Sequence, residues 1–274
     1  YLDMILTTFN NQYTDIKDLK TRYRLYDPVE GGFHRYSTKR DWSIPHYEKM
    51  LYDQAKLLRA YFQLYNITGD KKVKTAVDGT ISFTINKFYD KNGGFYSSQD
   101  AYLEEEYFGL SQKERSKIEP PHIDKTRPIS GNSMMISTFL YLYDITGNNS
   151  YREVAQQSLD FVQENMVGED GVYYYFDYEN QEAFLTGQAI SNSWTLLAFI
   201  EGYDVLEEEK YLQTAKNIAD YSLKELYDWK SGGFFERHSK DTKFYAPNER
   251  IDLSKPFEEN AVFAHSMLKL YILT

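Results

Sequence analysis

Segments that are apolar on nearly every face alternate along the chain with segments that are apolar on one face only. Residues 50–68 are of the first kind, which is typical of a buried helix, and Gly69 follows where a helix end favours glycine. Residues 71–90 are of the second kind, which is typical of a helix with one side in water. The two segments predict a helical hairpin with an inner and an outer helix.

This hairpin pattern repeats along the chain. Inner-type segments recur at residues 131–149, 191–209 and 259–274, and outer-type segments recur at 150–168 and 210–228, with one more at 2–13. Glycine turns open at Gly31, Gly93, Gly171 and Gly232, so they are spaced at similar, long intervals. Long periods with helices between them indicate stacked helical hairpins.

The links between the segments differ in length. Inner segments connect to outer ones by short turns, whereas the links back to the next inner segment are long and contain the glycine turns. All the long links fall at one end, because every inner helix runs the same way, and long loops in a compact domain are usually functional or disordered. We predict an all-α fold, an α/α toroid in a single domain over residues 1–274, with its functional end at the long loops; an incomplete ring is the alternative.

Composition narrows the class of protein. The 274 residues carry a net charge of −10, and no basic patch is concentrated anywhere, so nucleic acid is not an expected partner. No apolar run reaches the ~18 residues of a membrane span. The absence of cysteine excludes disulfides and thiolate chemistry. The 26 tyrosines suit helix packing and also sugar-like ligands. Because the chain starts at Tyr1, we expect a fragment or processed part of a longer chain.

The stretch from Gly31 to Tyr61 reads GGFHRYSTKRDWSIPHYEKMLYDQAKLLRAY and resembles the signature of the YyaL and spermatogenesis-associated-protein type of family. Shorter pieces of the pattern are GGFYSSQDA, PHIDK and GNSMM. The resemblance implies a toroid similar to six-hairpin glycosidases, joined in the family to a thioredoxin-like domain. It also implies glycosidase or sugar-epimerase chemistry through the fold, and it favours a cytoplasmic location, with export left open.

The sequence departs from the family pattern in three places. The thioredoxin-like domain and its cysteines are absent. YLEEEYFGL follows Ala101 where the family continues with a run rich in Ser, Glu and Gly, and SNSW stands where the family begins a helix with Asp-Asp-Tyr-Ala. The site carried over by the resemblance is therefore confined to residues 31–55.

Five side chains are candidates for catalysis. We predict a helix opened by Pro45, which would place His46 and Asp53, seven positions apart, on one face and Glu48 off it. Asp100 in a long loop and Glu258 on the last helix would complete the site. A glycosidase needs two carboxylates, and an epimerase needs bases such as His. The alternative is structural, because acidic residues near a helix N-terminus stabilise the helix dipole.

A second set of side chains is expected to bind a ligand or to hold the loops. Arg35 could pair with Asp41, and Trp42 could stack on a sugar ring or fill the hub. Aligning the inner segments places an amide at one level in all four repeats: Gln54, Asn132, Asn192 and Asn260. We predict that these amides face the toroid axis, where they would bind hydroxyl-rich ligands or the returning loops; capping of their own helices is the alternative.

Two classes of function remain open at this point. The first is a carbohydrate-active or carbohydrate-binding toroid with a saccharide in its mouth. The second is a non-catalytic scaffold that presents the same face to a protein or to a thioredoxin-like domain. The histidines and carboxylates lack the spacing of a metal-binding helix motif, so we expect no metal and no cofactor.

Overall fold

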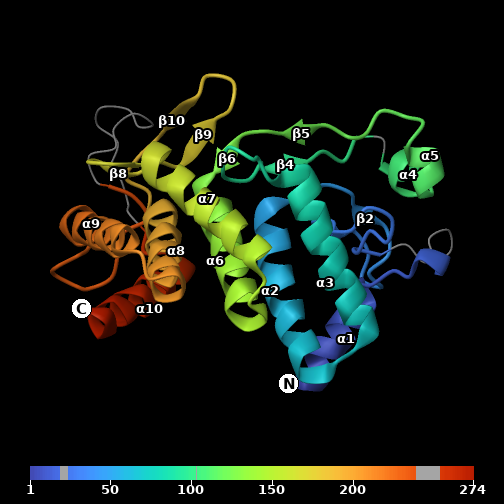
Figure 1. Ribbon diagram of the computed structural model, residues 1–274, viewed down its shortest axis with the longest axis horizontal. Helices are drawn as coiled ribbons and strands as arrows, with labels where there is room; N and C mark the ends of the chain where they lie inside the picture. Colours follow the sequence, from blue (N-terminus) through green and yellow to red (C-terminus); the bar gives the residue numbers. More distant parts are fainter. Residues whose placement is uncertain (19–23, 103, 239–253) are drawn as a thin grey trace. The chain divides into compact units, whose positions relative to one another are not determined.

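A computed structural model describes residues 1–18, 24–102, 104–238 and 254–274 (Figure 1). Its contacts divide the chain into two compact units, residues 1–90 with 95–125 and residues 91–94 with 126–274. A single domain over residues 1–274 stays a prediction. Part of the fourth long link, residues 239–253, lies outside the described residues.

The first unit is built around one helical hairpin, α2 (Leu51–Thr68) with α3 (Lys71–Phe83). Its other helices are α1 (Leu2–Gln12), α4 (Glu104–Phe108), α5 (Gln112–Arg115), the 3₁₀ helix η1 (Ile16–Asp18) and the π-helix η2 (Thr84–Phe88). Its strands are β1 (Tyr36–Ser37), β2 (Pro45–His46), β3 (Lys49–Met50), β4 (Ser98–Gln99) and β5 (Ile123–Asp124). The first predicted hairpin is thereby confirmed.

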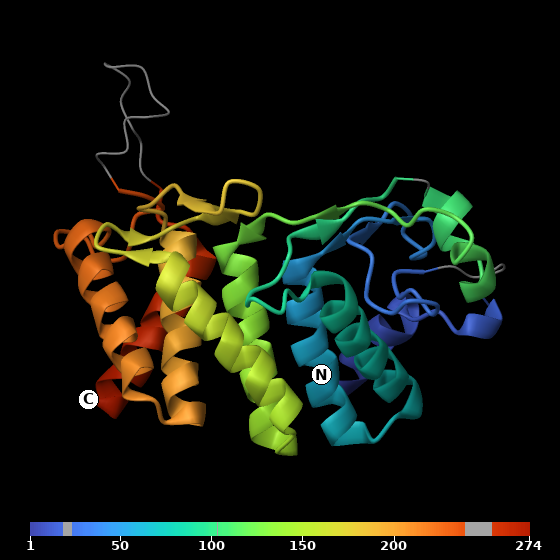
Figure 2. The same cartoon turned by 45° about the horizontal axis from the view of Figure 1, so that its top comes forward.

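The second unit contains two further hairpins and one more inner helix. The hairpins are α6 (Ile129–Thr146) with α7 (Asn149–Asn165) and α8 (Ala189–Leu206) with α9 (Glu209–Glu225), and the last helix is α10 (Phe257–Leu273). The strands are β6 (Arg127–Pro128), β7 (Val167–Gly168), β8 (Gly171–Val172), β9 (Tyr175–Asp177) and β10 (Glu182–Phe184). Figure 2 shows these strands at the ends of the helices where α6 and α8 begin.

Burial follows the inner and outer pattern within the second unit. In α6 every residue from Gly131 to Leu140 is buried, and α8 is buried almost as completely. Because these helices have no side in water, apolar residues occur on all of their faces. The outer helices α7 and α9 bury one face each. The exception is α10, which buries only Phe263 and Ser266 among its described residues.

The start of α2 differs from the prediction. The helix begins at Leu51 rather than at Pro45. Tyr36 pairs with His46 in the β1–β2 hairpin, and Met50 pairs with Ser98 in β4, so both pairings hold residues 45–50 in an extended conformation. His46 and Asp53 therefore lie on different elements and share no helical face.

The glycine turns hold the chain against the outer helices. Gly31 has φ +81°, which favours glycine, and a β-carbon there would lie 2.1 Å from the carbonyl oxygen of Gly79 in α3. The carbonyl of Leu25 accepts a hydrogen bond from the His34 amide, which closes the base of the turn. Any larger residue at Gly31 would push the turn away from α3.

Candidate functional site

Three of the predicted site residues lie close together beside the start of α2. The guanidinium Nη1 of Arg35 lies 2.8 Å from Oε2 of Glu48, and the same carboxylate oxygen lies 4.0 Å from Nδ1 of His46. The ring of His46 stacks on Tyr36, with centroids 4.9 Å apart. A hydrogen bond with Tyr52, and then the pairing with Glu48, raise the pKa of Arg35.

Asp53 is the fourth member of this group, which we call the α2 cluster: Arg35, His46, Glu48 and Asp53. It lies in the first turn of α2, and its Oδ2 is buried with no hydrogen-bond partner among the described residues. Burial raises the pKa of Asp53 to about 6, against the opposing charges of Arg35 and Lys56. Nδ1 of His46 is likewise buried without a hydrogen bond in the described part of the chain.

Trp42 lies in the loop of the β1–β2 hairpin that carries His46. Trp42 has φ +67° and Ile44 has φ +54°, which are conformations that non-glycine residues seldom adopt. The expected pair between Arg35 and Asp41 is not formed: Arg35 binds Glu48, and the Asp41 carboxylate accepts hydrogen bonds from Ser43. The loop is therefore organised by its own short contacts and by Arg24, which donates to the Asp41 carbonyl, rather than by Arg35.

The remaining two catalytic candidates lie on other elements. Asp100 is exposed at the end of β4, and its carboxylate accepts a hydrogen bond from the Tyr102 amide at 3.2 Å. Glu258 belongs to the second unit and is exposed in the first turn of α10. Whether either residue joins Asp53 at a common site stays a prediction.

The four repeated amides occupy the fourth position of α2, α6, α8 and α10. Each donates a hydrogen bond to the carbonyl four positions earlier, at Met50, Pro128, Gln188 and Pro256. Gln54 also binds both the amide and the carbonyl of Phe33, at 2.7 Å each. Asn260 binds Phe234 in the same way, and Asn192 accepts a hydrogen bond from Val172.

These bonds assign three of the amides a role in holding the returning loops. Phe33, Val172 and Phe234 each stand in or next to a glycine turn, and the side chains of Gln54, Asn132 and Asn192 are fully buried. The recurrence of an amide at this helix position thus has two structural explanations. Each amide binds the start of its own helix, and three of the four also bind a returning loop. Contact with a ligand stays a prediction.

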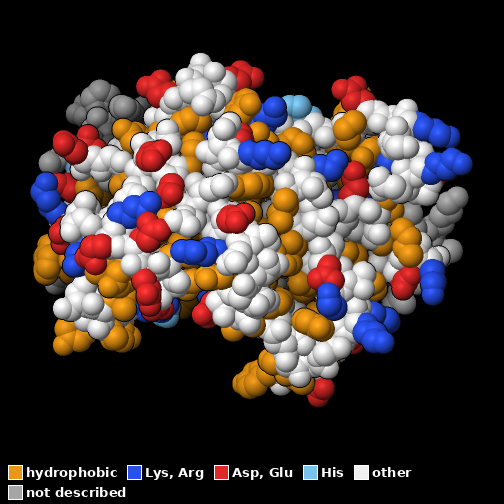
Figure 3. Space-filling model, in the orientation of Figure 1, with side chains coloured by type: hydrophobic (Ala, Val, Ile, Leu, Met, Phe, Trp, Pro, Cys, Tyr) orange, Lys and Arg blue, Asp and Glu red, His pale blue; other side chains and the backbone are white. Residues whose placement is uncertain are grey.

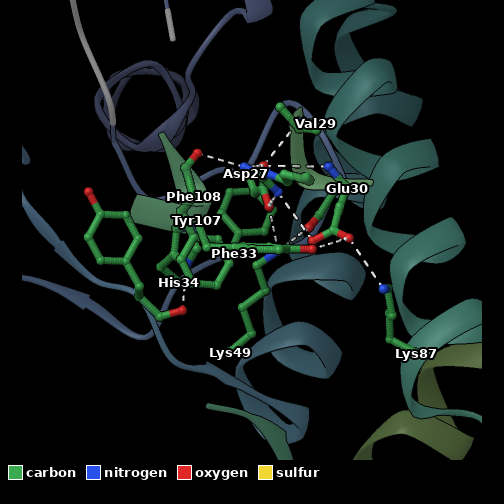
Figure 4. Close-up of polar contacts among 12 residues, drawn as sticks. Asp27, Val29, Glu30, Phe33, His34, Lys49, Lys87, Tyr107 and Phe108 are labelled. Atoms are coloured by element: carbon green, nitrogen blue, oxygen red, sulfur yellow. Dashed lines mark hydrogen bonds and ion pairs between the residues drawn. The ribbon is translucent and has the colours of Figure 1, made fainter. Parts of the chain in front are cut away.

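A buried ion cluster lies behind the first glycine turn (Figure 4). The ammonium group of Lys49 lies 2.8 Å from Oδ2 of Asp27, and both side chains are fully buried. Arg115, from α5, donates two hydrogen bonds to Asp27, at 2.8 and 3.1 Å, and one to the carbonyl of Phe108. Glu30 accepts from Arg115 and from the hydroxyl of Tyr107.

Electrostatics in this cluster favour charged pairs and a neutral histidine. Burial alone would raise the pKa of Asp27, but Lys49 and Arg115 hold it well below its usual range. Burial, followed by the charge of Lys49, lowers the pKa of His34 to about 3. Because the charged groups are paired with one another and have almost no access to solvent, the cluster links the turn to Lys49 and α5 and offers no opening to a ligand.

Sequence reasoning missed this cluster, although the chain repeats its signal. In the second unit Lys255 lies 2.6 Å from Asp228 and also donates to the carbonyl of Gly232, as Lys49 does to Gly31. Each Asp stands four positions before the glycine pair, and each Lys stands five positions before the repeated amide of the next helix. Comparing the two turns in the sequence could have found the pair.

The surface drawn in Figure 3 mixes acidic and basic side chains, with neither kind gathered into one large patch on that face. None of the helices in the described part of the chain is both long and apolar enough to cross a membrane.

Relatives of known sequence match part of the chain. The Homo sapiens protein named spermatogenesis-associated protein 20 is 35% identical over 123 residues, which are 41% of this chain and 16% of that protein. The Rattus norvegicus protein of the same name is 48% identical over 75 residues, which are 27% of this chain and 10% of that protein. The chain is similar to spermatogenesis-associated protein 20. The resemblance predicted from the sequence is thereby confirmed, for a chain that spans a small part of these relatives.

Solved structures show the fold. Cellobiose 2-epimerase from Bacillus thermoamylovorans superposes with a TM-score of 0.65 and 13% identity, over 100% of this chain and 69% of that one. A GH76 α-mannanase from Bacteroides thetaiotaomicron gives 0.64 and 14%, over 98% of this chain and 61% of that one. The α/α toroid fold class is thus confirmed. No protein-family model matches the chain.

Proposed function

We propose that the chain is a sugar-related toroid whose saccharide site is the α2 cluster. The observation that carries the proposal is Asp53, a carboxyl with a buried oxygen that no described residue binds, and with a pKa raised to about 6. Perturbed carboxyls of this kind gather at functional sites. The toroid neighbours, which are named as an epimerase and a mannanase, support sugar as the ligand class.

The surroundings of Asp53 suit a neutral, hydroxyl-rich ligand. Arg35 and Glu48 present donors and acceptors in one ion pair, and Tyr36 is 48% exposed while its ring stacks on His46. Sugars bind through this combination of aromatic faces and paired polar groups.

Two reactions fit the α2 cluster. A carboxyl whose pKa lies near 6 can donate a proton as well as accept one, so Asp53 suits the acid of a glycosidase with Glu48 as the second carboxylate. In an epimerase, His46 and Asp53 would remove and return a proton at one carbon. The second function is a scaffold, which is supported by the use of the repeated amides to hold the loops.

The test combines ligand binding with stability in the variant Asp53→Asn. A panel of neutral oligosaccharides is screened by NMR for binding and for turnover with wild type, Asp53→Asn and His46→Ala. We expect binding by wild type and loss of turnover in both variants. If wild type binds none of the panel, the sugar proposal fails and the scaffold is favoured.

Stability separates a functional Asp53 from a structural one. A raised carboxyl pKa means that the folded state keeps its proton between about pH 4 and pH 6, so stability falls as the pH rises through that window. Asp53→Asn should therefore raise the free energy of unfolding at pH 7 by about 1 kcal/mol. This is less than the full pKa shift implies, because the side chain is partly solvated. At pH 4 the free energy of unfolding should be nearly the same in the variant and in wild type. The exposed control Asp144→Asn should change neither value. A loss of stability at pH 7 would assign Asp53 a structural role.

A further inference from the structure

The four glycine turns are each closed by two paired residues, and in three turns both residues are aromatic. Tyr26, Tyr89 and Tyr227 pair with Phe33, Phe95 and Phe234, respectively. The third turn, between β7 and β8, has Val167 and Val172 at these places. The amide of Val172 binds the repeated amide of the next helix, as the phenylalanine amide does in the first and fourth turns. The third turn therefore lacks the tyrosine ring that the other three contain.

The first turn shows where such a ring lies. The side chain of Tyr26 is buried, and its hydroxyl donates a hydrogen bond to the carbonyl of Thr75 in α3, with an oxygen–oxygen distance of 3.2 Å. A β-carbon on Gly79, one helical turn further along α3, would lie 2.1 Å from the same hydroxyl oxygen. The tyrosine ring thus fills the space between its turn and the outer helix.

Two differences leave this space open in the third turn. Val167 has no ring or hydroxyl to extend toward α9. Asp170 stands where the other turns have the first glycine of their pair, and a side chain at that place needs room that the first turn gives to α3. A pocket of about 520 Å³ lies between the β7–β8 hairpin and α9, and its lining includes Val167, Gly168, Glu169, Asn217, Ile218 and Tyr221. This volume is within the range of small-molecule sites.

The wall of the pocket on α9 corresponds to the surface that the ring covers on α3. Asn217 follows the repeated amide of its hairpin at the same separation as Gly79 follows its own. By the same count, the carbonyl that matches the acceptor for Tyr26 belongs to Gln213. The ring of Tyr221 adds an aromatic wall, against which other rings can pack. The pocket therefore suits an aromatic ring whose hydroxyl donates to α9.

The tip of the β7–β8 hairpin gives the pocket a negative rim. Glu169 and Asp170 are exposed there, and neither forms an ion pair with another residue in the described part of the chain. Burial, and then the charges of Glu225 and Asp170, raise the pKa of Tyr221 to about 12. Glu225 is itself paired with basic neighbours, so the unpaired charge comes from the hairpin tip. A cleft bordered by one sign of charge attracts ligands of the opposite sign.

We infer that the pocket between the β7–β8 hairpin and α9 binds a small aromatic amine. A ring of the size of phenol takes the place of the missing tyrosine, and its hydroxyl donates to α9. The ammonium group of the ligand faces Glu169 and Asp170. The inference is independent of the proposed saccharide site, which belongs to the first unit.

The test uses three phenols of similar size that differ in charge: tyramine, para-ethylphenol and para-hydroxyphenylacetate. The protein is made with isotope-labelled glycine, so that the amide signals of Gly168 and Gly171 report on the pocket in NMR titrations. Val167→Tyr supplies the missing ring from the chain itself, and Val167→Thr, which keeps the size of the side chain, is the matched control. A variant with Glu169→Gln and Asp170→Asn removes the charge of the rim.

The expected result is binding that follows the charge of the probe. Tyramine should shift the two glycine signals at about tenfold lower concentration than para-hydroxyphenylacetate, with para-ethylphenol between them, because two exposed carboxylates attract one probe and repel the other. The variant without the rim charges should bind all three probes about equally. Val167→Tyr should abolish binding of all three, whereas Val167→Thr should bind as wild type does.

Three outcomes would overturn the inference: tyramine leaves both glycine signals in place, wild type binds the three probes equally, or folded Val167→Tyr binds tyramine as wild type does. If Val167→Tyr does not fold, Asn217→Trp takes its place, because Asn217 is exposed on α9 and a large ring there should block the pocket. Unchanged binding of tyramine by Asn217→Trp would then reject the site.

Discussion

The turns at residues 27–33 and 228–234 share one design and differ in their cover. In each, a Tyr pairs with the Phe after the glycines, an Asp begins the turn, and a Lys just before the next inner helix binds that Asp and a glycine carbonyl. Asp27 and Lys49 are fully buried, whereas the side chains of Asp228 and Lys255 are 17% and 28% exposed. The same pair is therefore a buried charge in one turn and a partly solvated one in the other.

The difference comes from the segment that follows β4. In the first unit α4 and α5 bring Tyr107, Phe108 and Arg115 over the turn, and Arg115 adds a second cation to Asp27. Burial makes each ion dependent on its partners, because a charge without a partner is costly away from water. The same sequence pattern thus makes Asp27 depend strongly on its cations in the first unit and makes Asp228 depend only weakly on Lys255 in the second.

The largest expected effect comes from removing the lysine in each turn. Lys49→Met should lower the free energy of unfolding by about 3 to 5 kcal/mol, because it leaves the buried Asp27 with one cation and also removes the donor to the Gly31 carbonyl. Lys255→Met, the matched change in the second turn, should cost far less, since water reaches Asp228. Urea unfolding of both variants compares them. Equal losses would show that burial does not separate the two turns.

A smaller effect is expected from Arg115→Met, which removes the ion pair between Asp27 and the α4–α5 segment that lies over the turn. Asp27 keeps Lys49, so we expect a loss of about 2 kcal/mol together with faster hydrogen exchange in residues 104–118. Lys113→Met, on the exposed side of α5, is the control and should alter neither. If exchange speeds up equally in both variants, Arg115 does not hold the cover.

The smallest effect concerns acid sensitivity in the first turn. His34 is neutral when folded, with a pKa of about 3, whereas an unfolded His takes up a proton near pH 6.5, so stability is lost as the pH falls below that value. His34→Asn can keep the donor to the Tyr47 carbonyl without titrating. Between pH 7 and pH 5 wild type should lose more stability than this variant, by about 1 to 2 kcal/mol, because only the wild-type histidine takes up a proton on unfolding. His265→Asn, at an exposed site, should follow wild type.

The helices of this fold could be predicted because their signals are local. Apolar periodicity separated inner from outer helices, and Gly69 ends α2 in the left-handed conformation as expected. Gly147 ends α6 in the same conformation. The start of α2 could not be predicted, since Pro45 suits a first helical turn as well as a strand. Pairing with Tyr36 in a short hairpin, and with Ser98 far along the chain, decides between the two.

The site was predictable only in part for the same reason. Arg35, His46, Glu48 and Asp53 stand close together in the sequence, and the structure holds the first three in contact around Glu48. Asp27 and Arg115 are 88 residues apart, and nothing local marks them as partners. A loop between them decides that contact, and the order of apolar and polar residues in a loop carries little information on its path.

The repeated amides also bear on the order in which the chain folds. Gln54, Asn192 and Asn260 bind turns that lie 21, 20 and 26 residues earlier, so each turn is secured by the helix made next. Such short separations lower the contact order and shorten the search for native contacts. During synthesis, each repeat can therefore close soon after its inner helix leaves the ribosome, without waiting for the remainder of the protein.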